Sequence, residues 1–365
     1  RYPLSTIVGM VEGPNYILNP DFQRRHRWNI QKKSKLIESI IMNVPIPPIF
    51  LYEKAFSVYE VMDGLQRLTA IKQFYKNEFA LVDLAEWPEL NGKTYRELPD
   101  QVQKGIDRRY ISSIIILQET AKDATEAQRL KQLVFERINS GGEKLAGQET
   151  RNAIYNGELN KVCIKLARNI TFCELWEIPK PTPEEADPNA DLPENLIMNP
   201  LFSKMEDAEL VLRFFAYRQI EKWQSTILEE FLDNYLQEAN KFNEETINEL
   251  ETIFNNTIEF AHNLFGKKAF WIYRKRREKE SRKIKWSFYE KSSKTIYDPM
   301  MYVLSTLHEK QGILIKRRNE IIESMPDFYM RNYASFEGRS SNRNDVIKRI
   351  NLLYKHIDKF STVAE

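Results

Sequence analysis

The sequence predicts an α+β protein, with a small mixed α/β domain at the N-terminus and an α-helical domain after it. Three observations predict this fold. Strand-like and helix-like segments alternate up to residue 119, whereas helical periodicity dominates beyond residue 123. A segment rich in proline and acidic residues, 178–195, separates the two patterns. The expected domains are therefore residues 1–177 and residues 196–365.

The composition indicates a soluble protein with a sizeable core. Of 365 residues, 42% are hydrophobic and 29% are charged, and the net charge is +2. So small a net charge favours no polyanionic partner by itself, and any such partner must be argued from a local patch. We find no apolar run of the roughly 20 residues that a membrane helix needs. Two cysteines without nearby histidines suggest no zinc site, and we expect a cytoplasmic location.

The N-terminal domain is expected to contain strands around one early helix. Asn29 is a plausible N-cap for a helix over residues 30–43, and the "VPIPP" that follows ends it. The apolar face of this helix is expected to consist of Ile30, Ile37, Ile40, Ile41 and Val44. Strands are expected at 15–20, at 49–53 and 57–63 as a hairpin, and at 110–119.

The rest of the chain has a helical pattern. One helix is expected over residues 124–139, and two more are separated by Gly157. Beyond the acidic segment the pattern is helical almost throughout, without an internal repeat. Helices are expected at 147–157, 158–169, 205–223, 225–242, 245–265, 298–310 and 345–360.

A strand leads into a helix at residues 57–75, with Asp63-Gly64 and Gln66-Arg67 at the junction. The first turn of such a helix has unpaired backbone N–H groups, and these donors and the helix dipole favour an anion. Gly64 allows a tight turn or a close approach, and Arg67 supplies a planar cation suited to phosphate. Asp63 could hold a Mg²⁺-bound water. A simpler interpretation makes Asp63 the N-cap and Arg67 a solvated residue.

A basic segment, "FQRRHRW", covers residues 22–28. Its arginines and aromatic rings could bind phosphate or stack on a base. It could equally be a solvated basic turn that Phe22 and Trp28 anchor.

Another polar segment is "FERINSGGEKLAGQETRNA". Asn139 and the glycines 141–142 are expected to end one helix, as in an ordinary C-cap. Glu149, Arg151 and Asn152 open the next helix. They could contact a ligand, or they could be exposed helix residues.

Ten basic residues and only two acidic ones occupy residues 267–285, interleaved with aromatic residues. Such a segment is typical of a nucleic-acid interface, and a solvated helix face is the alternative. The candidate contacts are Lys267, Lys268, Arg274, Lys275, Arg276 and Arg277.

Several kinds of site are not indicated by the sequence. The remaining histidines, His262, His308 and His356, lack the spacing of metal ligands. We find no Walker loop and no G-x-S-x-G elbow, so neither a hydrolase triad nor a metal nuclease can be assembled. No metal site is expected.

In this order, the segments resemble the N-terminal domain of the GmrSD type IV restriction family (domain of unknown function 262). That domain is similar to the ParB and sulfiredoxin nucleotide-binding fold. The family pattern is Q-R-x-x-x-W, then D-G-Q-Q-R, then I-N-x-x-G-x-x-L-x-x-x-E. Leu65 departs from it by replacing the first glutamine of the turn, and we expect Leu65 to face the core. The matching residues are Gln23, Arg24 and Trp28; Asp63, Gly64, Gln66 and Arg67; and Ile138, Asn139, Gly142, Leu145 and Glu149.

The resemblance implies nucleotide binding at the D-G-x-Q-R turn, often with NTP hydrolysis, in bacterial defence against modified phage DNA. Relatives couple this domain to an HNH-type nuclease segment. No such segment is visible here, which implies a separate nuclease partner or another use of the pocket. The expected cofactor is an NTP with Mg²⁺, and DNA is an expected partner.

Two hypotheses follow from the resemblance. In the first, the protein binds and hydrolyses an NTP; in the second, it is a non-catalytic nucleotide or DNA sensor that recruits a nuclease. The sequence leaves the nucleotide and the oligomeric state open. In the first hypothesis Arg67 and Gly64 bind phosphates, Gln66 orients a phosphate or water, Asp63 assists a cation or the turn, Gln23 and Arg24 close the pocket, and Asn139 lies at its rim.

Overall fold

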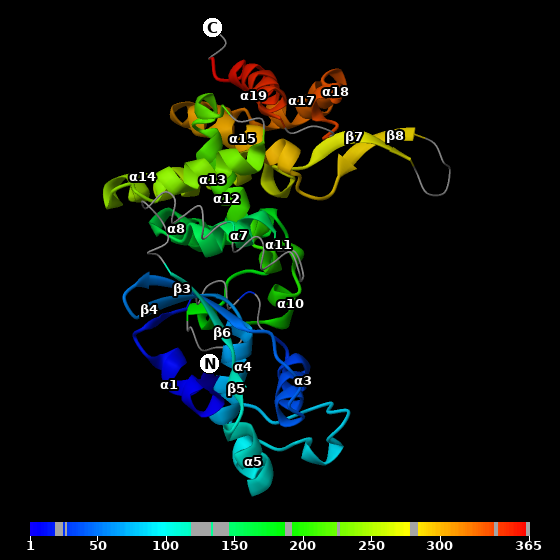
Figure 1. The fold of residues 1–365 in the computed structure, drawn as a ribbon. Helices are drawn as coiled ribbons and strands as arrows, with labels where there is room; N and C mark the ends of the chain where they lie inside the picture. Colours follow the sequence, from blue (N-terminus) through cyan, green and yellow to red (C-terminus); the bar gives the residue numbers. More distant parts are fainter. Residues whose placement is uncertain are drawn as a thin grey trace. The chain divides into compact units, whose positions relative to one another are not determined.

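The structure, a computed structural model, describes residues 1–18, 25, 28–117, 133, 146–186, 192–224, 227–277, 284–338 and 342–362. The chain divides into two compact units, Arg1–Leu145 and Ala146–Glu365 (Figure 1). This division comes before the proline- and acid-rich segment. Each unit is described by itself below.

The first unit contains a four-stranded mixed sheet in the order β2-β4-β3-β6. β3 and β4 form the antiparallel hairpin that the sequence predicts, and β2 and β6 pair parallel to them at the two edges. A separate antiparallel pair joins β1 to β5. The strands are β1 (Tyr2–Pro3), β2 (Tyr16–Ile17), β3 (Ile49–Ala55), β4 (Val58–Asp63), β5 (Tyr110–Ile111) and β6 (Ser113–Leu117).

The helices of the first unit pack together over a common core (Figure 1). α4 contacts both α1 and α3, and α3 also contacts α5. The core joins Ile49 and Leu51 of the sheet to Leu68, Ile71 and Phe74 of α4. The helices are α1 (Ile7–Glu12), α3 (Ile30–Ile41), α4 (Leu65–Tyr75) and α5 (Asp100–Asp107).

Most predicted elements of this unit are confirmed. The side chain of Asn29 caps α3 by accepting from the backbone N–H of Lys32. Ile37 and Ile40 are buried, but Ile30 and Val44 are exposed and do not belong to the apolar face. The strand predicted over 110–119 is divided into β5 and β6, which join different sheets. The predicted helix over 124–139 lies outside the described residues, apart from Leu133.

The second unit is mainly helical, which confirms the α+β class. Its core brings α8, α12, α14 and α15 into contact, and α19 packs on α15. Aromatic rings such as Phe172, Phe214, Phe254 and Tyr297 fill this core. Its helices are α7 (Gly147–Ile154), α8 (Glu158–Leu166), α9 (Ile170–Leu175), α10 (Glu194–Ile197), α11 (Pro200–Ser203), α12 (Glu206–Tyr217), α13 (Leu228–Ala239), α14 (Glu244–Phe265), α15 (Lys294–Thr306), α16 (Gln311–Lys316), α17 (Arg318–Arg331), α18 (Tyr333–Phe336) and α19 (Arg343–Asp358).

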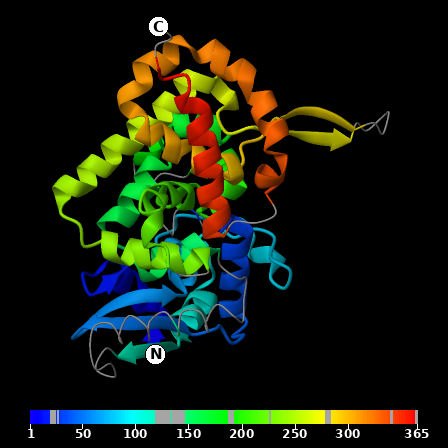
Figure 2. The same ribbon diagram turned by 90° about the horizontal axis from the view of Figure 1, so that it is seen from above.

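An antiparallel hairpin interrupts the helices of the second unit. It consists of β7 (Ile272–Arg277) and β8 (Ile284–Tyr289). Figures 1 and 2 show this hairpin, in yellow, standing out from the helices of its own unit. The prediction of an α-helical C-terminal domain is therefore incomplete, because the basic segment forms strands.

Two further predictions concern the cysteines and membrane-spanning segments. Cys163 and Cys173 are both buried and unbridged. Burial raises the pKa of the Cys163 thiol, so this side chain packs in the core as a small, neutral residue. Within the described ranges, no helix combines the length and the apolar character that a bilayer crossing requires.

Candidate functional site

The turn between β4 and α4 brings together Asp63, Gly64, Gln66 and Arg67. Asp63 ends β4, and Gly64 is the N-cap of α4 in a left-handed conformation, with φ 92° and ψ 7°. A Cβ at Gly64 would lie 2.5 Å from Cγ2 of Ile49, which is closer than real contacts allow. Both the backbone angle and the lack of space therefore require glycine here.

The guanidinium of Arg67 is held beside this turn. Its Nη2 donates to Oδ2 of Asp63 over 2.8 Å and to the carbonyl of Pro48 over 3.1 Å. Asp63 thus binds Arg67 and does not cap α4, and the Arg67 side chain is only 14% exposed. The simpler interpretation, a capping aspartate beside a solvated arginine, is wrong.

The first turn of α4 carries backbone donors that make no hydrogen bond within the helix. The first intrahelical bond of α4 runs from the N–H of Leu68 to the carbonyl of Gly64 over 3.0 Å. The amides before Leu68 have no partner within the helix, and no side chain caps it. In addition, Nε of Arg67 is buried and has no hydrogen-bond partner among the described residues. The turn therefore places backbone amide donors next to the Arg67 guanidinium, whose hydrogen bonds to described residues use Nη2.

A hydrogen bond joins this turn to the basic segment. Oε1 of Gln66 accepts from the backbone N–H of Trp28 over 3.1 Å. Two of the three predicted motifs therefore meet directly. Gln23 and Arg24 lie outside the described residues, as does Asn139.

Arg25, within the same basic segment, is only 4% exposed. The alternative interpretation, a solvated basic turn, therefore does not hold for Arg25, and residues 22–24, 26 and 27 lie outside the described part of the chain. Sequence reasoning did not single out Arg25, and nothing in a run of arginines indicates which of them is buried.

The third motif continues into the second unit, where Glu149 belongs to α7. Its carboxylate accepts from the backbone N–H of Ala146 and so fixes the start of the helix. Glu149, Arg151 and Asn152 are all 3% exposed or less. The interpretation of these residues as exposed helix residues is wrong.

Arg151 explains this burial. Its Nε donates to Oδ1 of Asp233 over 2.6 Å, and its Nη1 donates to Oε2 of Glu209 over 3.1 Å. Asp233 lies on α13 and Glu209 on α12, so one buried guanidinium ties α7 to both helices. These contacts assign Arg151 to the packing of the second unit.

The predicted nucleic-acid contacts lie on and next to the β7–β8 hairpin. Lys267 and Lys268 occupy a short 3-10 turn after α14, and Arg274, Lys275 and Arg276 are on β7. Figure 1 shows this hairpin as the yellow ribbon. The segment is thus a β-ribbon and not the solvated helix face of the alternative. Arg277 ends β7, and its side chain is outside the described part of the chain.

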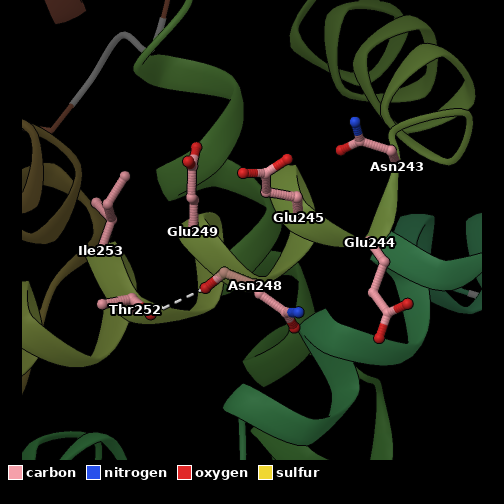
Figure 3. A pocket seen from close by; sticks show the side chains of 7 residues that line it. All are labelled: Asn243, Glu244, Glu245, Asn248, Glu249, Thr252 and Ile253. Carbon is pink, nitrogen blue, oxygen red and sulfur yellow. Dashed lines mark hydrogen bonds between the residues drawn. The ribbon is translucent and has the colours of Figure 1, made fainter.

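A surface hollow at the start of α14 is not related to these motifs. Figure 3 shows its lining residues on successive turns of the helix, with the hydroxyl of Thr252 bonded to the carbonyl of Asn248. Its lining is acidic, polar or aliphatic, which does not suit a phosphate. The lining residues are Asn243, Glu244, Glu245, Asn248, Glu249, Thr252 and Ile253.

Within the described ranges, no group of three or more His, Cys, Asp or Glu side chains could hold a metal ion. Asp63 is the acidic side chain predicted to assist a cation, and its carboxylate is bound to Arg67.

Comparison with known families identifies the N-terminal region. Residues 6–156 match the family described as GmrSD restriction endonuclease, N-terminal domain. This region is a GmrSD N-terminal domain. No curated protein matches the chain, and no solved structure matches it.

The GmrSD match includes both the D-G-x-Q-R turn and α7. The matched residues therefore continue past the first compact unit, which ends at Leu145, into the second. Glu149 of the GmrSD motif has a structural role there, because its carboxylate fixes the N-terminus of α7. The turn and α7 thus serve different parts of the chain.

Proposed function

We propose that this chain is a restriction-like DNA defence protein whose GmrSD N-terminal domain binds and hydrolyses an NTP. The family description, a restriction endonuclease domain, supports the defence role. The observation that carries this proposal is the Gly64 turn, where the first-turn amides of α4, which make no hydrogen bond within the helix, lie beside the Arg67 guanidinium.

Phosphate recognition at this turn follows from its donors. The amides of Leu65, Gln66 and Arg67 point out of the first turn of α4, where the helix dipole favours negative charge. Both hydrogen bonds that Arg67 makes to described residues use Nη2, so other donors of the guanidinium can bind phosphate oxygens. The buried Nε without a described partner fits an acceptor that a ligand supplies.

The remaining groups suit phosphoryl transfer. Arg67 would stabilise charge that develops on the transferred phosphate, and its fixed position avoids reorganisation during the reaction. Asp63, whose side chain is 38% exposed, is accessible to a hydrated Mg²⁺. Gln66 orients the Trp28 backbone through its Oε1. Its amide nitrogen would orient a phosphate or the attacking water.

The proposal is tested by thermal unfolding of the full chain with each of four NTPs, with and without Mg²⁺. Binding to the folded state raises the melting temperature by mass action. We expect a shift with the wild type and none with Arg67→Ala. Exposed Arg96 of the same unit provides the control, because Arg96→Ala should keep the shift. Equal shifts for Arg67→Ala and Arg96→Ala would mean that the nucleotide does not bind at the Gly64 turn.

A second candidate is a non-catalytic sensor that binds nucleotide or DNA and recruits a separate nuclease. The basic β7–β8 hairpin favours this function, because three of its cations are on β7 and two of them, Lys275 and Arg276, are exposed. Phosphate release measured with and without DNA separates the two functions. Nucleotide binding without release under either condition would favour the sensor.

A further inference from the structure

The two faces of the β7–β8 hairpin differ in their surroundings. On one face the rings of Tyr273 and Trp286 stack with centroids 5.9 Å apart, and Phe288 meets Tyr273 edge-on at 5.1 Å. Trp286 also contacts Tyr333 of α18, with centroids 5.3 Å apart. Directly opposed residues of an antiparallel pair share a face, so this aromatic face is the one that anchors the hairpin.

On the other face, the residues beyond the pair of Ile272 and Tyr289 are basic or polar. Arg274 lies opposite Ser287, and Arg276 lies opposite Lys285. The guanidinium carbons of both arginines lie over the same ring, at 4.2 Å and 5.5 Å from the centroid of Tyr289. The ring fixes the two guanidinium groups, while their edges stay available for hydrogen bonds.

Among the described residues neither Arg274 nor Arg276 forms an ion pair, although the chain contains nearly as many acidic as basic residues. Two like charges on one ring repel each other, and an anionic ligand between them would relieve this repulsion. The arrangement is therefore suited to a polyanion.

We propose that this basic face, defined by Arg274, Arg276, Lys285 and Ser287, enters the major groove of double-stranded DNA. The major groove of B-DNA admits a two-stranded β-ribbon, whereas that of an A-form RNA duplex is too narrow. Alternate residues of a strand are about 6.7 Å apart, close to the rise of about two base pairs. Arg274 and Arg276 can thus reach phosphates or guanine edges that are two base pairs apart. This inference rests on the proposed function only in that the protein acts on DNA.

The test measures binding of a labelled DNA duplex to the full chain by fluorescence anisotropy at several salt concentrations. Each phosphate contact contributes about one unit to the slope of log affinity against log salt. The double variant Arg274→Ala with Arg276→Ala should lower this slope by about 2. The charge-matched control, Lys241→Ala with Arg331→Ala, removes two exposed cations elsewhere in the unit and should leave the slope unchanged.

Two further measurements separate groove entry from general attraction. Replacing both arginines by lysine should keep the salt slope, because the charge stays, but should weaken binding because bidentate contacts are lost. An RNA duplex of the same sequence should bind more weakly than DNA. An unchanged slope in the alanine variant, or equal affinity for RNA and DNA duplexes, would overturn the proposal.

This outcome is independent of the nucleotide site. The alanine variant at the hairpin should keep the thermal shift with NTP, whereas Arg67→Ala should keep DNA binding. Loss of only one activity therefore identifies which of the two proposals has failed.

Discussion

Nη2 of Arg67 and Oδ2 of Asp63 are 2.8 Å apart across the Gly64 turn. The carboxylate holds the guanidinium in place next to the first-turn amides of α4. It also places a negative charge beside the proposed phosphate site. Any phosphate that binds there must share Arg67 with this aspartate.

Asp63→Asn is therefore expected to raise the affinity for an NTP measured in the presence of EDTA. The substitution removes a negative charge close to the anion and keeps a side chain of the same size. Isothermal titration calorimetry provides the measurement. If Asp63 also assists Mg²⁺, the added metal should no longer increase affinity in the variant. Weaker binding in EDTA would contradict the shared-guanidinium arrangement.

Gly64→Ala is expected to lower the free energy of unfolding by roughly 1–3 kcal/mol, because a Cβ adds both strain and a clash with Ile49. Urea denaturation measures the change. Gly92→Ala is the matched control, since Gly92 also has a positive φ but nothing lies within 4 Å of its Cβ position. The control should cost only about 1 kcal/mol, from backbone strain alone. Equal losses would show that the clash is relieved by movement of Ile49.

Arg151→Ala is expected to destabilise the second unit by roughly 3 kcal/mol, since it removes the buried guanidinium that pairs with both Glu209 and Asp233. Lys161→Ala removes an exposed ion pair with Glu158 and should change stability by less than about 0.5 kcal/mol. Chemical denaturation followed by circular dichroism compares the two variants. A small effect at Arg151 would mean that water reaches the network.

Burial, together with the positive charges of Lys359 and Arg331, lowers the pKa of His356 to about 4. The unfolded chain binds a proton at His356 near pH 6.5, so it holds more protons than the folded chain between about pH 4 and 6.5. Folding stability should therefore fall as the pH is lowered through this window.

The His356→Gln variant should lose this part of the pH dependence, which urea midpoints at pH 7.5, 6.5, 5.5 and 4.5 would measure. His308→Gln, at an exposed position, is the control and should follow the wild type. Parallel curves for wild type and the His356 variant would assign the acid sensitivity to other groups.

The sequence predicted the β3–β4 hairpin and the Gly64 turn, because alternation and a strand-to-helix change are local signals. The sequence also predicted Asn29 as the N-cap of α3 and Leu65 as a core-facing residue, and both predictions are confirmed. The GmrSD motifs in the sequence predicted the family of the N-terminal domain, and the family match confirms this prediction.

Other features depend on long-range contacts and could not be predicted in this way. The ion pairs of Arg151 join residues 58 and 82 positions away along the chain. The basic segment forms strands whose rings, Trp286 and Phe288, pack on Tyr333 and Tyr273. Its charge pattern does not indicate these contacts. The roles predicted for Gln23, Arg24 and Asn139 remain predictions, since these residues lie outside the described part.

The position of α7 has a practical consequence for anyone who expresses the GmrSD domain alone. A truncated polypeptide that stops at residue 156 would retain Arg151 but would lack Glu209 and Asp233. A guanidinium that is normally enclosed would then face solvent at the end of a short helix that has lost its packing surface. Fragments that end near residue 145 should be easier to purify than fragments cut at the limit of the family match.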